Sequence, residues 1–135
     1  FRARYEIHLD SYRKKVNIEA KTCVDMVLHE ILPAAMCYNR DLCELILNKK
    51  QLGLSCEAET QLAQQLSSNT DALYECCERL QRDLAHIPDG KEAVANYYDV
   101  IVSDMDALRA HADIIESLTD KKYWPYPTYS DLLFY

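Results

Sequence analysis

The side chains that could carry chemistry are four histidines, six cysteines and 22 acidic residues. A two-metal site in a helical bundle uses a carboxylate from each of two helices and a Glu-x-x-His motif on each of two others. The nearest matches are Asp83 with His86, three positions apart, and Asp25 with His29, four apart. Neither pair is a Glu-x-x-His motif, so both are better explained as ordinary solvent-exposed side chains than as metal ligands. A two-metal bundle enzyme therefore stays open only as a rival hypothesis.

Other reaction centres have even less support in the sequence. The cysteines form no Cys-x-x-Cys pair, and no nucleophile motif joins a cysteine to a histidine. Free cysteines in a helical domain behave as small apolar side chains. With only Gly53 and Gly90, the chain has no glycine-rich loop to cradle a phosphate. The sequence predicts no catalytic, no cofactor-binding and no metal-binding residue.

The charge balance argues against nucleic acid and membrane partners. The formal net charge is −7, and the longest basic run is Arg13 to Lys15. Nucleic-acid binders and proteins of anionic membrane surfaces need a larger basic patch. No apolar run approaches the ~18–20 residues needed to span a bilayer. The chain begins at Phe1 within a helical pattern, so we expect a piece of a longer protein.

Low glycine and proline content, with 49% hydrophobic residues, predicts an all-α fold. A stripe of apolar side chains predicts one long helix over residues 17–52. Pro33 lies inside this helix and predicts a kink rather than an end, because the stripe continues in register beyond it. The stripe consists of Val24, Leu28, Ile31, Ala35, Tyr38, Leu42, Leu45 and Leu52.

Three further helices complete the predicted domain, which spans residues 1–135. A shorter one covers residues 2–15, with Asn17 as an N-cap that separates it from the long helix, and a continuous helix is the alternative. Gly53 predicts a left-handed cap, followed by helices over 55–86 and 89–118. Because three long helices joined by short turns must be antiparallel, we expect an elongated antiparallel bundle plus the shorter N-terminal helix.

The predicted tail, residues 119–135, differs from the helices in its aromatic character. Pro125 and Pro127 favour an extended path. A segment this apolar is expected to dock on a surface, either of this bundle or of a neighbouring subunit. The candidate interface residues are Trp124, Tyr126, Tyr129, Leu132, Leu133 and Phe134.

Two segments near the ends of the chain are more specific than any periodicity. The first reads Arg-Tyr-Glu-Ile at 4–7, Asn-Ile-Glu-Ala at 17–20 and Glu-Ile-Leu-Pro-Ala at 30–34. The second reads Tyr-Trp-Pro-Tyr-Pro-Thr-Tyr-Ser-Asp-Leu-Leu-Phe at 123–134. Together they resemble the C-terminal helical region of type III glutamine synthetases, the large bacterial form. Ser130 stands where that signature has glycine.

The resemblance implies a cytoplasmic parent enzyme that makes glutamine from glutamate, ammonia and ATP, with Mg or Mn at its active site. Such enzymes form ring-shaped homo-oligomers, and their catalytic motifs would lie upstream of Phe1. No catalytic residue is carried over, so we expect this chain to be inactive alone. Its expected role is to brace the catalytic region of the same chain and to contact neighbouring subunits. The alternative is a free-standing helical protein–protein interaction module.

Overall fold

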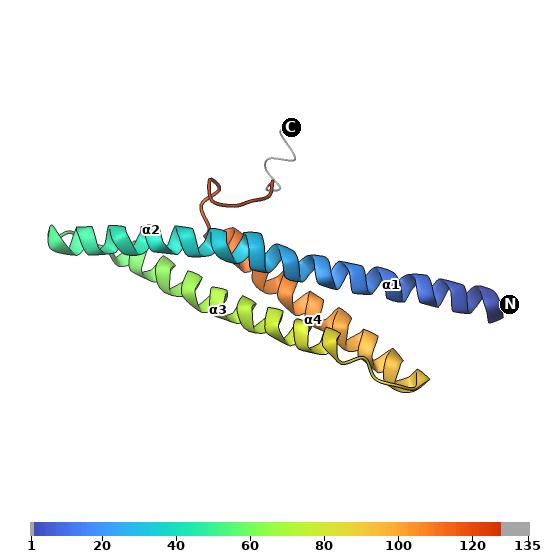
Figure 1. The fold of residues 1–135 in the computed structure, drawn as a ribbon. Coiled ribbons are helices and arrows are strands. Elements are labelled where there is room, and N and C mark those ends of the chain that lie inside the picture. The colour runs from blue at the N-terminus through green and yellow to red at the C-terminus, as the bar shows by residue number, and fades with distance from the viewer. Residues whose placement is uncertain (1, 128–135) are drawn as a thin grey trace.

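The computed structural model describes residues 2–127, with side chains from His8 onward. The chain forms α1 (Arg2–Met26), the π-helical turn η1 (Val27–Ile31), α2 (Leu32–Gln51), α3 (Glu57–Ala85) and α4 (Lys91–Leu118) (Figure 1). No strand occurs within residues 2–127. The predicted all-α class is confirmed.

The first three elements form one continuous helical rod (Figure 1). They contain 25, 5 and 20 residues, which corresponds to about 75 Å at 1.5 Å per residue. The predicted break at Asn17 is wrong, and the continuous alternative is what the structure shows. Instead of capping a helix, Asn17 Nδ2 donates a hydrogen bond to Tyr98 Oη of α4 at 3.0 Å. On either side of it, Val16 and Ala20 are buried in the core.

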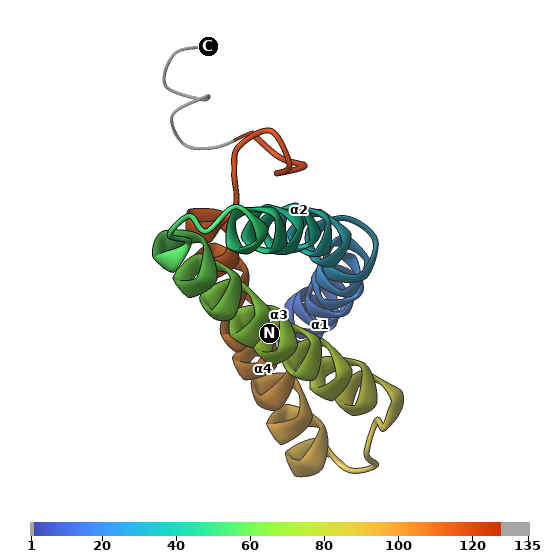
Figure 2. The same ribbon diagram turned by 90° about the vertical axis from the view of Figure 1, so that its left-hand side faces the viewer.

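The rod does not end at Pro33, because the backbone changes its hydrogen-bonding pattern just before that residue. The Leu32 N–H bonds the carbonyl of Val27, five residues back, which closes a π-helical turn. Pro33 has no N–H, and its ring would clash with the carbonyl four residues back in a regular α-helix. A π turn at this point absorbs the disruption locally. Figure 2 shows the rod changing direction between α1 and α2.

An antiparallel hairpin of α3 and α4 packs beneath the rod (Figures 1 and 2). The α2 segment lies along α3, while α1 contacts α4 and, to a lesser extent, α3. Leu66, Leu73 and Leu80 recur every seven residues on α3, and all three are completely buried. Ile101 and Ile115 of α4 are equally buried. Seven-residue spacing keeps one face of a helix against its neighbours, so these side chains form a single core along the bundle.

The rod ends in the predicted left-handed cap. Gly53 has φ +73, and its N–H bonds the Lys50 carbonyl at 3.2 Å. The N–H of Leu54 bonds the Lys49 carbonyl at 2.9 Å, which completes a Schellman motif. Across this turn, Lys49 Nζ pairs with Glu59 Oε2 of α3 at 2.6 Å. This pairing lowers the pKa of Glu59, chiefly through its hydrogen bond to Lys49.

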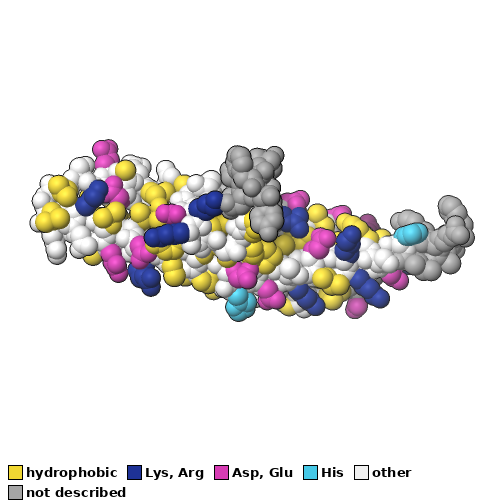
Figure 3. All heavy atoms as spheres, turned by 90° about the horizontal axis from the view of Figure 1, so that it is seen from above, with side chains coloured by type: hydrophobic (Ala, Val, Ile, Leu, Met, Phe, Trp, Pro, Cys, Tyr) yellow, Lys and Arg dark blue, Asp and Glu magenta, His cyan; other side chains and the backbone are white. Residues whose placement is uncertain are grey.

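Two members of the predicted stripe lie outside the core. Leu45 is 43% exposed and Leu52 is 74% exposed. The α2 segment packs mainly on α3, whereas α4 packs on α3 and on α1. The outer part of α2 therefore has one main partner helix, which covers only one side of it. Hydrophobic side chains are visible at the α2 end of the surface in Figure 3.

Candidate interface groove

A tight turn after α4 brings the tail back across the rod. Thr119 is buried, and its hydroxyl donates to the Ile115 carbonyl at 2.7 Å. The N–H of Tyr123 bonds the Asp120 carbonyl at 3.0 Å, and the N–H of Lys122 bonds Asp120 Oδ1 at 3.1 Å. Asp120 thus stabilises the reversal of the chain through both its backbone and its side chain.

Tyr123 fastens this turn to α2. Its hydroxyl donates a hydrogen bond to the carboxylate of Asp41. Its ring lies 5.1 Å from the ring of Tyr38, centroid to centroid, with the planes 39° apart. The bond to Asp41, followed by burial, raises the pKa of Tyr123 to about 12. Burial also raises the pKa of Tyr38. Both phenols therefore stay neutral at physiological pH and can serve as hydrogen-bond donors.

Trp124 and Tyr126 hold the next part of the tail against the rod. Their rings meet edge to face, with centroids 6.3 Å apart. The hydroxyl of Tyr126 donates to the carboxylate of Glu30 in η1, and both rings pack on the core. These two candidate interface residues therefore contact this chain's own bundle. The other four, Tyr129, Leu132, Leu133 and Phe134, lie outside the described residues.

A groove of about 460 Å³ lies between the rod and α4, and tail residues form part of its lining. Ile18, Cys23, Met26 and Ile31 form its rod-side wall. From α4 come Leu108 and Ala112, and from the tail come Trp124, Tyr126 and Pro127. The lining also includes the charged residues Glu19, Arg109, Asp113 and Glu116. An apolar channel with charged residues beside it is typical of a site that receives another apolar segment.

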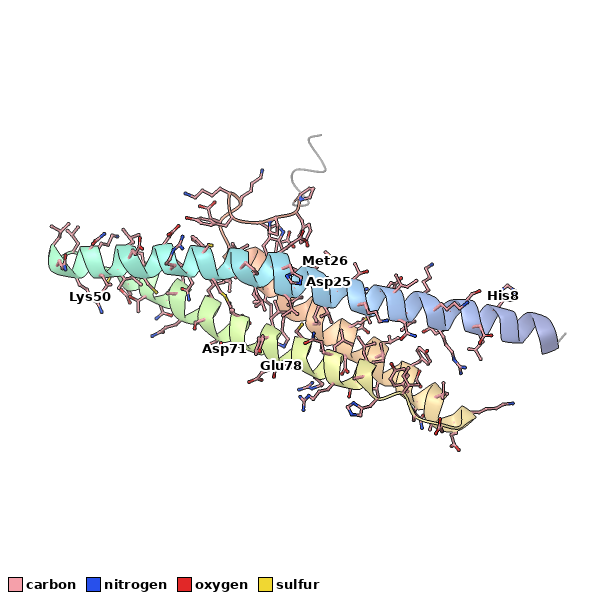
Figure 4. All side chains as sticks on the ribbon, in the orientation of Figure 1. His8, Asp25, Met26, Lys50, Asp71 and Glu78 are labelled. Atoms are coloured by element: carbon pink, nitrogen blue, oxygen red, sulfur yellow. The ribbon has the colours of Figure 1, made fainter. Side chains whose placement is uncertain are left out.

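The structure does not assemble the rival two-metal site. Asp25 and His29 line a separate hollow with Glu30. His86 caps the end of α3, where its Nδ1 donates to the Arg82 carbonyl at 2.8 Å. Figure 4 places Asp25 near the middle of the rod. Within the described residues, no three or more histidine, cysteine or acidic side chains gather as they would around a metal ion.

One buried acidic side chain was missed by the sequence reasoning. Asp104 of α4 is only 9% exposed, and its Oδ2 has no hydrogen-bond partner in the described part of the chain. Burial, reinforced by the nearby Asp83 carboxyl of α3, raises the pKa of Asp104 to about 6. A signal was present, because Asp104 continues the helical spacing of Tyr97, Ile101 and Leu108. That spacing places position 104 in the core, whatever residue occupies it.

Helices Arg2–Met26 through Lys91–Leu118 also lack any segment long and apolar enough to cross a membrane. Residues 123–127, which dock on the rod, are called the strap below. The fold and the groove thus define the class of protein as an all-α bundle with an aromatic strap and an apolar groove beside it. Comparison with known proteins makes this class more specific.

A family model described as the glutamine synthetase C-terminal domain matches residues 1–50. A glutamine synthetase of Butyrivibrio fibrisolvens is 34% identical over 137 residues, which cover 98% of this chain and 20% of that relative. One from Bacteroides fragilis (strain YCH46) is 28% identical, covering 97% and 19%. A type-3 glutamine synthetase of Dictyostelium discoideum is 27% identical, covering 98% and 19%.

The recognition from the two end segments is therefore confirmed. This chain is related to the C-terminal domain of glutamine synthetases, including a type-3 form. It spans about a fifth of the length of the curated relatives it matches.

We predict that Asp104→Asn makes the stability of the bundle less dependent on pH. The folded-state pKa of about 6 lies above the ordinary value of 3.8, so the protonated carboxyl favours folding. This contribution is fully present below about pH 4 and is lost as the pH rises through about 6. At pH 8 the variant should be more stable than the original chain by up to about 3 kcal/mol. At pH 4 the difference should be small.

Urea unfolding followed by circular dichroism at both pH values measures this effect. Asp106→Asn is the matched control, because Asp106 is an exposed residue of the same helix. Equal pH dependence in the Asp104→Asn variant and the original chain would contradict the assignment of a buried carboxyl.

We also predict that Tyr123→Phe loosens the strap. The change removes the hydrogen bond to Asp41 and leaves the aromatic ring in place. A hydrogen bond of this kind contributes about 0.5–1.5 kcal/mol, so trypsin cleavage after Lys122 should accelerate roughly 2–10-fold. Mass spectrometry of the released C-terminal peptide measures the rate. Tyr12→Phe, on the exposed face of α1, is the control and should not change it. Equal cleavage rates in Tyr123→Phe and the original chain would show that the Asp41 contact does not hold the strap.

Proposed function

We propose that this chain is the C-terminal helical domain of a larger glutamine synthetase of type III, and that its role is structural. The observation that carries the proposal is the pattern of coverage. Each relative aligns with nearly all of this chain, yet the chain matches only about a fifth of each relative. The comparisons favour this function over a free-standing interaction module, since each of these relatives is a glutamine synthetase.

The complete enzyme would make glutamine from glutamate, ammonia and ATP. We assign its nucleotide site and its Mg or Mn ions to the rest of that enzyme. None of the catalytic motifs of the family occurs in this chain. The chain is therefore expected to be inactive alone, and the complete enzyme is expected to work in the cytoplasm.

The shape of the bundle supports a bracing role. A rod of about 75 Å, packed on the α3–α4 hairpin, can connect surfaces that are far apart. Apolar side chains are exposed along it, among them Tyr12 on α1, Met36 on α2, and Leu47, Leu52 and Leu54 around the end of α2. Surfaces of this kind favour contact with a protein partner. In the complete enzyme they would meet the catalytic region and neighbouring subunits of a ring-shaped homo-oligomer.

We predict that weakening the bundle in the complete enzyme disrupts assembly and leaves substrate affinity unchanged. Leu73 and Leu80 are fully buried, and replacing each with alanine should cost about 2–5 kcal/mol of stability. The mass of the oligomer, measured by mass photometry, should fall, and specific activity should fall with it. The KM for ATP in the fraction that remains assembled should stay within about twofold.

Ile87→Ala is the control, because Ile87 is exposed in the turn between α3 and α4. An intact oligomer in which the KM for ATP or glutamate changes more than about fivefold would contradict the proposal. It would mean that this domain contributes to the active site.

A further inference from the structure

We propose that copies of this chain associate head to tail, with the leucines at the α2 end of one copy docked in the groove of the next. Residues 45–55, which include the end of α2 and the turn after it, are called the tip below. The inference rests on the subunit contacts proposed above and names the two surfaces that form one of them.

The tip exposes several large apolar side chains close together. Leu47, Leu52 and Leu54 lie within eight consecutive residues and are 63%, 74% and 55% exposed. Leu45 is also exposed, and hydrophobic side chains are visible at this end of the molecule in Figure 3. Scattered apolar residues are ordinary on a protein surface, but a group of this kind is typical of a surface that contacts another protein.

The groove is the apolar hollow that such a group of side chains would fit. Its volume of about 460 Å³ is bounded by side chains of the rod and of α4, among them Met26 and Leu108. Clefts that take up apolar groups typically measure about 300–1,000 Å³. Docking of the leucines would release water from both surfaces, which is favourable for both.

The charge of the tip is positive. Residues 45–55 contain two lysines and no acidic side chain. Lys49 pairs with Glu59 of α3, whereas Lys50 is exposed. Figure 4 places Lys50 at the outer end of α2. The tip therefore presents a lysine beside its leucines.

The charge of the groove is negative. Its lining includes Glu19, Asp113 and Glu116, with Arg109 as the basic side chain among them. Arg109 lies 4.0 Å from the carboxylate of Glu19. Neither Asp113 nor Glu116 forms a salt bridge with a described residue. Opposite charges favour a tip in a groove, and like charges disfavour two grooves or two tips in contact.

One copy cannot place its own tip in its own groove. Leu52 lies 21 residues beyond Ile31 of the groove wall, which corresponds to about 31 Å along a continuous helix. The contact must therefore join two copies through different surfaces, which makes it heterologous. Each docked copy still offers a free tip or a free groove, so association continues past two copies into a ring or a filament.

Sedimentation velocity of the 135-residue chain tests the association. The original chain should gain mass between about 5 and 200 µM and pass beyond the dimer. The tip variant carries Leu52→Gln and Leu54→Gln, and the groove variant carries Ile18→Lys and Asp113→Lys. All four residues are exposed, so both variants should keep their helical content by circular dichroism. Each variant alone should associate at least about tenfold more weakly than the original chain.

Mixing the two variants tests the head-to-tail arrangement itself. The tip variant keeps an intact groove, and the groove variant keeps an intact tip. An equimolar mixture should therefore form a pair of two 15.7 kDa chains and stop there, because no further intact surface is left. Met36→Gln and Ile114→Lys are the matched controls. Both residues are exposed outside the tip and the groove, and each variant should associate like the original chain.

Three results would overturn the proposal. An original chain that stays monomeric up to about 200 µM would mean that something other than a second copy covers the groove, residues 128–135 of this chain included. Unchanged association in either variant would exclude that surface. Association that is lost in both variants but does not return on mixing would indicate a contact between identical surfaces. None of these results would refute the structural role, which the Leu73 and Leu80 variants of the complete enzyme measure separately.

Discussion

The continuity of the rod through Pro33 is the constraint on which the rest of the structure depends. A helix that ended at this proline would give two separate helices of ordinary length, each with its own partners. The π-helical turn η1 instead carries the helix through, and the rod reaches about 75 Å. The α3 helix packs along α2, and α4 packs on α3 and on α1. The two halves of the rod therefore share one core, but much of the rod's surface has no partner helix within the described residues.

The same turn also organises the groove. Glu30, within η1, receives the hydroxyl of Tyr126, and Ile31 forms part of the groove wall. The strap is thus fastened where the rod changes direction, close to the hairpin core. Asp104, by contrast, destabilises the packing of α4 at neutral pH. Burial raises the pKa of this carboxyl, so its ionised form is costly to hold in the core.

Much of the fold could be predicted from local patterns, because helical periodicity and glycine caps are encoded by neighbouring residues. The helices and the cap at Gly53 are of this kind. The errors came from long-range effects. Asn17 has the chemistry of an N-cap, but its amide found Tyr98, 81 positions away. Leu52 fits the apolar stripe, but periodicity does not report which sides of a helix have partner helices. The contact between Tyr123 and Asp41 spans 82 positions and has no local signal.

The groove itself could not be predicted, because it exists only where α1, α4 and the strap meet. What the sequence did carry was the aromatic composition of the strap and its resemblance to a family. The central claim, that this bundle is a structural domain of a glutamine synthetase, is tested most directly by the reading frame upstream of the Phe1 codon. The account predicts an open frame that encodes a glutamine synthetase catalytic region. A stop codon followed by a start codon at this point would contradict it, and the chain would then be a separate helical protein.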